Sequence, residues 1–147
     1  MDDYGYRPKG TYLNAADWQG LYVLTGHWKS DLEFYRDDLK FLQQLIDKYF
    51  IWMVRKESLD EVREIESDLV EIARKCDQLI KRTIKHLTHL ADLVEAPVDS
   101  PIFRAEHAGL EEDIAIFVKA FRTNRKEVFA ITEHVMDTEK LSRLIKS

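Results

Sequence analysis

Six side chains able to bind a metal ion occur in this chain as three pairs, each with helical spacing. The pairs are His27 and Asp31, His86 and His89, and His107 and Glu111. Their members lie three or four residues apart, which places both side chains on one face of a helix. Imidazole and carboxylate groups at such intervals on facing helices are how helical bundles hold transition metals. The spacing therefore indicates a candidate metal site, provided that folding brings the pairs together.

Long helices are the elements that must position these pairs. Apolar residues recur at alternating intervals of three and four along the segments 28–53, 62–93 and 103–135, a pattern typical of long helices packed against one another. The expected helices span residues 14–55, 58–95 and 101–145. Residues 1–13 look like an N-terminal tail, and residues 14–147 like a single three-helix domain.

The connections between these helices predict their directions. Ser58 and Ser100 are good N-caps, Pro101 suits the first helical position, and Pro97 disfavours helix in the residue before it. The first connection is then very short, which forces neighbouring helices to be antiparallel. We therefore predict an all-α, up-down-up antiparallel bundle of three long helices with heptad, coiled-coil-like packing.

This antiparallel register brings the three pairs to one level of the bundle. Pairing the helices across the two connections sets His86 level with Trp28 on the first helix and with Leu110 on the third. Gly26 and Gly109 fall in the same band. At these glycines the helix backbones either approach closely or leave a small void.

Heptad phase distinguishes the members of the band. His86 and His107 occupy core positions, His89 and Glu111 flank them, and His27 falls outside the seam. In one interpretation the histidines form a buried polar layer, bonded to each other, to Glu111 and to Asp31. In the other, the band binds a transition metal or a small ligand. Under either interpretation, a buried histidine near a carboxylate is sensitive to pH.

The segment His107–Glu111 resembles the H-x-x-x-E element of haemerythrin-like proteins. The resemblance implies that these two residues are metal ligands. It covers five residues, and the H-x-x-x-H and H-x-x-x-x-D elements of that family do not occur in this chain. No family is therefore assigned.

A second apolar stripe lies beside the heptad seam of the first helix. Its members are Phe34, Phe41, Leu45 and Trp52. Such side chains either widen the core, are covered by the tail, or form a surface for self-association that completes a larger bundle. Large exposed apolar patches usually mark contacts. We therefore expect at least a homodimer.

Two further residues interrupt the apolar stripes. Asn124 lies within the third stripe, where a buried asparagine sets the register between helices. Cys76, the only cysteine, lies within the second stripe and is expected to be an inert core thiol.

Composition excludes several classes of partner. The formal net charge of −5 disfavours nucleic acids and anionic membranes, which need a basic surface. No stretch is apolar enough to span a membrane, and the N-terminal segment is not a secretory signal, so a cytoplasmic location is expected. There is no glycine-rich phosphate loop, nucleophile elbow or zinc-type spacing.

Nothing in the sequence specifies a reaction. The first hypothesis is a non-enzymatic interaction or scaffold protein without a cofactor, which self-associates or binds partner helices through its aromatic stripes. The alternative hypothesis is a metal-binding or redox helical protein that holds a transition metal in its bundle core.

Overall fold

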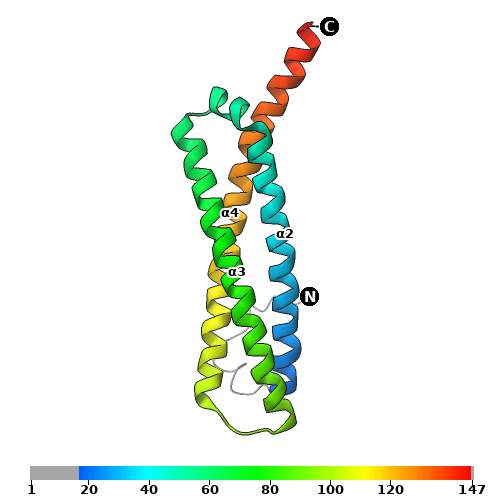
Figure 1. Ribbon diagram of the computed structural model, residues 1–147, viewed down its shortest axis with the longest axis vertical. Helices are drawn as coiled ribbons and strands as arrows, with labels where there is room; N and C mark the ends of the chain where they lie inside the picture. Colours follow the sequence, from blue (N-terminus) through cyan, green and yellow to red (C-terminus); the bar gives the residue numbers. More distant parts are fainter. Residues whose placement is uncertain (1–16, 147) are drawn as a thin grey trace. The chain divides into compact units, whose positions relative to one another are not determined.

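The computed structural model describes residues 17–146 of the chain, with side chains described for residues 17–136. Three long helices make up almost all of this part: α2 (Trp18–Lys56), α3 (Leu59–Glu95) and α4 (Pro101–Lys146) (Figure 1). The described residues contain no strand. The helices pack against one another, which confirms the predicted all-α three-helix bundle.

By their contacts, these helices form two compact units, which are described separately below. The first unit contains α2 up to Tyr35 and the segment Cys76–Phe117. The second unit contains the segment Arg36–Lys75 and α4 from Val118 onward. Each unit therefore holds one segment of each helix. Within each unit, the α3 segment runs antiparallel to the α2 and α4 segments (Figure 1).

Helix α2 begins at Trp18 rather than near residue 14. Its cap is Asp17, whose Oδ1 accepts a hydrogen bond of 2.7 Å from the backbone N–H of Gly20. Residues 1–16, including the predicted tail, lie outside the described residues.

The other two predicted N-caps are confirmed. Ser58 Oγ accepts a hydrogen bond of 3.0 Å from the N–H of Glu61, and Ser100 Oγ accepts one of 3.2 Å from the N–H of Phe103. These bonds satisfy backbone donors in the first turns of α3 and α4, which have no partner within the helix. The helix boundaries therefore follow from local side-chain chemistry.

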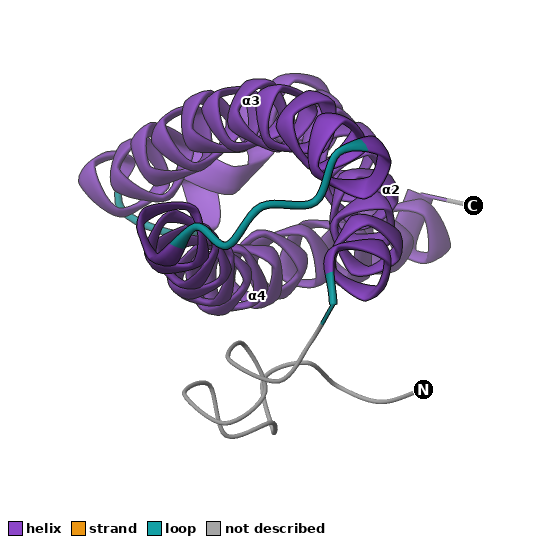
Figure 2. Ribbon diagram, turned by 90° about the horizontal axis from the view of Figure 1, so that it is seen from below, coloured by secondary structure: helices purple, strands orange, loops and turns teal. Residues whose placement is uncertain are grey.

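The heptad pattern corresponds closely to the buried surface of each helix. Every residue of the predicted α4 stripe, from Phe103 to Val135, is buried. In the first unit, a core cluster combines residues from all three helices: Trp18, Leu21, Leu90, Leu93 and Phe103. Figure 2 looks onto this end of the first unit, where the connection between α3 and α4 crosses from one helix to the other.

Buried threonines satisfy their own hydroxyl groups within each helix. Thr25, Thr83 and Thr132 each donate a hydrogen bond of 2.7 Å to the backbone carbonyl four residues earlier. Burying these hydroxyl groups therefore costs little free energy, because each donor has an acceptor. Along residues 17–146, no helix is both long and apolar enough to cross a membrane.

Candidate functional site

The core of the first unit contains a column of four stacked rings contributed by all three helices. Trp28 of α2 stacks on His107 of α4, with ring centroids 4.8 Å apart. His107 stacks on His86 of α3 at 5.0 Å, and His86 lies nearly parallel to Phe103 at 4.4 Å. Both imidazoles are therefore held between other rings.

The two histidines are joined by a direct hydrogen bond. His86 Nε2 and His107 Nδ1 lie 2.8 Å apart, and both side chains are buried. Burial, together with the charges of nearby His89 and Arg82, lowers the pKa of His86 to about 4. Burial, together with the charges of His86 and Arg104, lowers the pKa of His107 to about 3. The pair is therefore neutral at pH 7.

The flanking members of the predicted band differ in their surroundings. Glu111 is buried like the two histidines, at 2% exposure, but neither histidine forms a hydrogen bond with it. His89 is exposed, with the edge of its ring against Phe103. The polar layer observed here is thus a bonded histidine pair beside a buried carboxyl group.

The α2 members of the band stay apart from this pair. His27 is exposed and Asp31 is half-buried. Burial raises the pKa of Asp31, and the charge of nearby His27 opposes that shift. Neither side chain forms a hydrogen bond with His86 or His107, which are bonded to each other. Of the six predicted ligands, only His86 and His107 are thus bonded to each other.

Among the described residues, no group of three or more His, Cys, Asp or Glu side chains is arranged to hold a metal ion. A transition metal in a bundle core needs several such ligands converging on one point. The histidine pair by itself supplies only two imidazoles, already bonded to each other.

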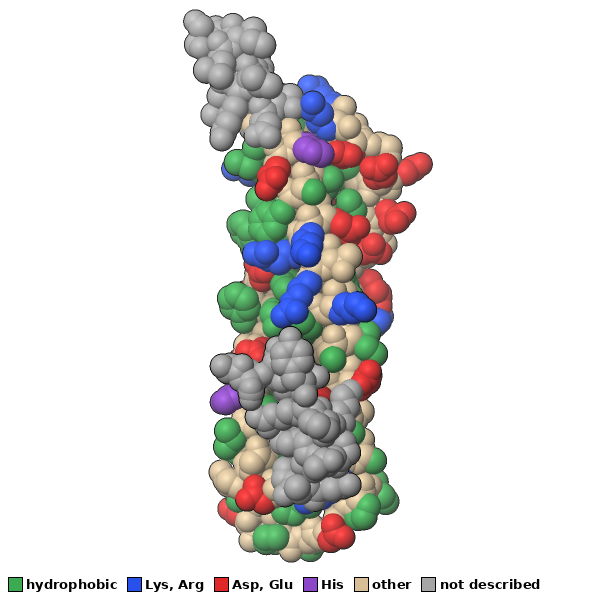
Figure 3. All heavy atoms as spheres, turned by 180° about the vertical axis from the view of Figure 1, so that it is seen from behind, with side chains coloured by type: hydrophobic (Ala, Val, Ile, Leu, Met, Phe, Trp, Pro, Cys, Tyr) green, Lys and Arg blue, Asp and Glu red, His purple; other side chains and the backbone are tan. Residues whose placement is uncertain are grey.

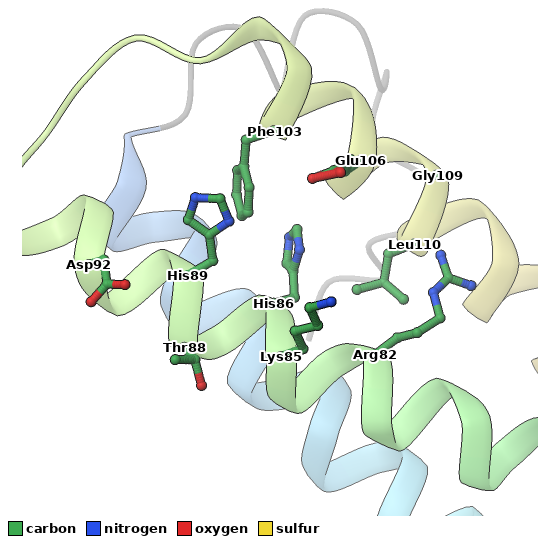
Figure 4. A pocket seen from close by; sticks show the side chains of 10 residues that line it. All are labelled: Arg82, Lys85, His86, Thr88, His89, Asp92, Phe103, Glu106, Gly109 and Leu110. Atoms are coloured by element: carbon green, nitrogen blue, oxygen red, sulfur yellow. The ribbon is translucent and has the colours of Figure 1, made fainter.

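An open groove of about 770 Å³ lies beside His86, between α3 and α4 of the first unit. His86 lines it, together with Lys85 and His89 from α3 and with Glu106 and Leu110 from α4 (Figure 4). Gly109 opens this surface further, because a Cβ atom built there meets no atom within 4 Å. The same holds for Gly26, so neither glycine marks a close approach of backbones.

The second unit carries an aromatic face, formed by Phe41, Leu45 and Trp52 of α2 with Phe129 and Met136 of α4. Phe41 and Trp52 are each 46% exposed, and the rings of Phe41 and Phe129 lie 6.5 Å apart. Hydrophobic side chains gather along the left side of the upper part of Figure 3, with Lys and Arg side chains beside them. Of the predicted α2 stripe, Leu45 is half-buried and Phe34 belongs to the first unit, where it is 65% exposed.

Asn124 is buried in the second unit, as its place in the stripe predicts. Its Nδ2 donates a hydrogen bond of 3.1 Å to the backbone carbonyl of Ile65, which ties α4 to α3. Its Oδ1 is enclosed without a hydrogen-bond partner. Its role in setting the register remains a prediction.

The groove contains two residues that sequence reasoning did not recognise as a site. From the sequence alone, Arg82 and Lys85 are expected to belong to a solvated surface, because charged residues are abundant on every helix of this chain. The available signal was their spacing from His86 and His89, which places all four on adjoining faces of α3. Comparison with protein-family models, curated proteins and solved structures gave no match.

Proposed function

We propose that this chain is a non-enzymatic interaction protein that self-associates through the aromatic face of its second unit. The observation that carries the proposal is the exposure of Phe41 and Trp52 on one side of α2. Residues 41, 45 and 52 are separated by four and seven, so they share one helix face. Phe129 and Met136 are seven apart on α4 and extend this face.

The energetics favour covering such a face. An aromatic side chain buries about 150–250 Å² when fully enclosed. Phe41 and Trp52 each have 46% of their surface exposed. At about 25 cal/mol per Å², covering the remainder contributes about 2 kcal/mol per ring. Two copies of the face meeting would cover twice as many rings, a gain that opposes the free-energy cost of association.

The charges around the aromatic face suit a symmetric contact. Arg125 lies 4.6 Å over the ring of Phe129 and donates a hydrogen bond of 2.9 Å to Asp38. Arg55 lies 4.9 Å over the ring of Trp52. In a two-fold interface the same patch faces itself, so a border with both charge signs avoids repulsion between identical groups.

Sedimentation velocity on the full chain tests the proposal. We expect the unaltered protein to sediment as a dimer or higher oligomer at micromolar concentration. The double variant Phe41→Lys with Trp52→Lys should sediment as a folded monomer, because two buried ammonium groups would be uncompensated. Val70→Lys is the matched control, since Val70 is also an exposed hydrophobic residue, at 58%, but lies on α3 of the same unit.

Two outcomes would overturn the proposal. One is an unaltered protein that remains monomeric at high concentration. The other is a double variant that keeps the oligomeric state of the Val70→Lys control. Circular dichroism on each variant establishes that the helices are retained, so that loss of assembly is not confused with unfolding.

A further inference from the structure

The groove of the first unit has basic groups and Asp92 on its α3 side, and apolar residues with Glu106 on its α4 side. Figure 4 shows Lys85 and His86 on α3, on the opposite side of the groove from Leu110 and Gly109 of α4. Arg82 lines the same groove but bonds to Asp113 at 2.7 Å. Lys85 forms no ion pair with any described residue, so its charge is available to a ligand.

The hydrogen bond within the histidine pair determines what His86 offers to the groove. Its Nε2 is engaged by His107 Nδ1, which leaves Nδ1 as the ring nitrogen available to a ligand. On the other ring, His107 Nε2 is enclosed without a hydrogen-bond partner. A buried N–H without an acceptor is rarer in proteins than a buried acceptor without a donor.

The favoured tautomer therefore keeps the His107 proton on Nδ1, where it is donated to His86 Nε2. His86 then carries its own proton on Nδ1. The groove thus presents an N–H donor from His86 and the ammonium group of Lys85, both of which line it. Two donors on the same side of one groove, one of them charged, are suited to the two oxygens of a carboxylate.

The α4 side of the groove limits the size and charge of the ligand. Leu110 supplies an apolar surface, and the open space at Gly109 can take an apolar group. Glu106 lines the same side. Its carboxylate disfavours a dianion such as phosphate, because like charges in a partly enclosed site repel.

We propose that this groove is a binding site for a small organic monocarboxylate. The carboxylate accepts hydrogen bonds from Lys85 and from His86 Nδ1, and the apolar body of the ligand lies against Gly109 and Leu110. This site is in the first unit, whereas the aromatic face is in the second, so the two proposals fail or hold independently.

The electrostatics of His86 supply a reporter for binding. Its pKa is lowered to about 4 by burial and by the charges of His89 and Arg82. A bound anion offsets both charges and favours the protonated ring. Saturating ligand should therefore raise the pKa of His86, whereas an anion bound elsewhere would leave it unchanged.

Nuclear magnetic resonance with benzoate as the probe tests the site directly. We expect benzoate to shift the amide signals of residues around His86 and Gly109, and to raise the pKa of His86. Lys85→Gln should weaken benzoate binding about 10-fold, the effect of losing one charge-assisted hydrogen bond. Lys81→Gln is the control, because Lys81 is an exposed α3 lysine that does not line the groove. Equal affinities of the two variants would overturn the proposal.

Two further comparisons separate this site from unspecific binding. Benzamide has the shape of benzoate without its charge, and inorganic phosphate has charge without an apolar body; either binding as tightly as benzoate would contradict the assigned chemistry. Gly109→Leu should fill the groove and abolish the shifts. Gly26→Leu, at the other open glycine of the same unit, should leave them unchanged. Benzoate binding that survives Gly109→Leu would place the ligand elsewhere.

Discussion

At the scale of single residues, the bonded pair of His86 and His107 is the most unusual feature of the core. Each ring is stacked on both sides, and the pair forms one hydrogen bond. Such a pair is favoured in its neutral form, because burial disfavours a charged imidazolium. The stability of the first unit therefore depends on pH through these two side chains.

We expect the free energy of unfolding to fall as the pH is lowered from 6.5 toward 4. The folded pKa values of about 4 and 3 lie below the ordinary value of 6.5, so the unfolded chain takes up protons first. The full stability is present above pH 7. Protonation of one histidine lowers the free energy of unfolding by roughly 2 kcal/mol, after allowance for the solvent that reaches His86. Urea unfolding at a series of pH values measures it.

The variant in which both His86 and His107 are replaced by leucine should show a flatter dependence over that range. His134→Gln is the control, because His134 is exposed in the second unit and bonds to Glu57. A double-leucine variant that loses stability as steeply as the control would contradict the assignment of the effect to the histidine pair.

Sequence reasoning reached part of this arrangement. Heptad phase placed His86 and His107 in the core, because spacing determines which face of a helix a residue occupies. Spacing does not determine the rotamer. The stacking on Trp28 and Phe103, and the absence of a hydrogen bond from either ring to Glu111, depend on how rings of three helices fit together.

At the scale of elements, the start of α2 shows how packing decides a helix boundary. The sequence predicted a helix from residue 14, whereas Asp17 is a good N-cap by residue type. The helix begins at Trp18, with Asp17 as its cap, and Trp18 and Leu21 enter the core cluster at once. Burial of these side chains favours this start, and residue preferences at N-caps do not include that contribution.

Removing the cap should weaken the first unit by about 1 kcal/mol. Asp17→Ala deletes the acceptor for the Gly20 N–H and leaves that donor dependent on water. Asp17→Asn should preserve most of the stability, because asparagine caps about as well. Urea unfolding at pH 7 compares the two; a loss of equal size in both variants would point to charge rather than capping.

The three helices themselves were predictable because their signals agree. The apolar repeat, the caps Ser58 and Ser100, and Pro101 all indicate the same boundaries. The groove was not predictable, since it depends on empty space beside Gly109 rather than on any motif.

At the scale of the whole molecule, the two units differ in what they place in and on the core. The first contains the histidine pair and the open groove, and the second contains Asn124 and the aromatic face. Proteins open locally in cooperative groups, with free energies that follow the packing of each group. We therefore expect the units to respond differently to acid.

Hydrogen exchange at pH 5 and pH 7 measures this difference. Amides in residues 76–95 and 101–117 should lose more protection on acidification than those in 36–56 and 59–75, once exchange is corrected for its intrinsic pH dependence. The reason is that both titrating core histidines lie in the first unit. An equal loss across the chain would indicate a single cooperative response instead.

Cys76 gives the first unit a chemical label of its own. It is the only cysteine of the chain, it is buried in α3, and its thiol donates a hydrogen bond of 3.3 Å to the backbone carbonyl of Leu32. A disulfide reagent can reach its sulfur only when this part of α3 separates from α2. The rate of thiol modification therefore measures how often that opening occurs, and it needs no mutation.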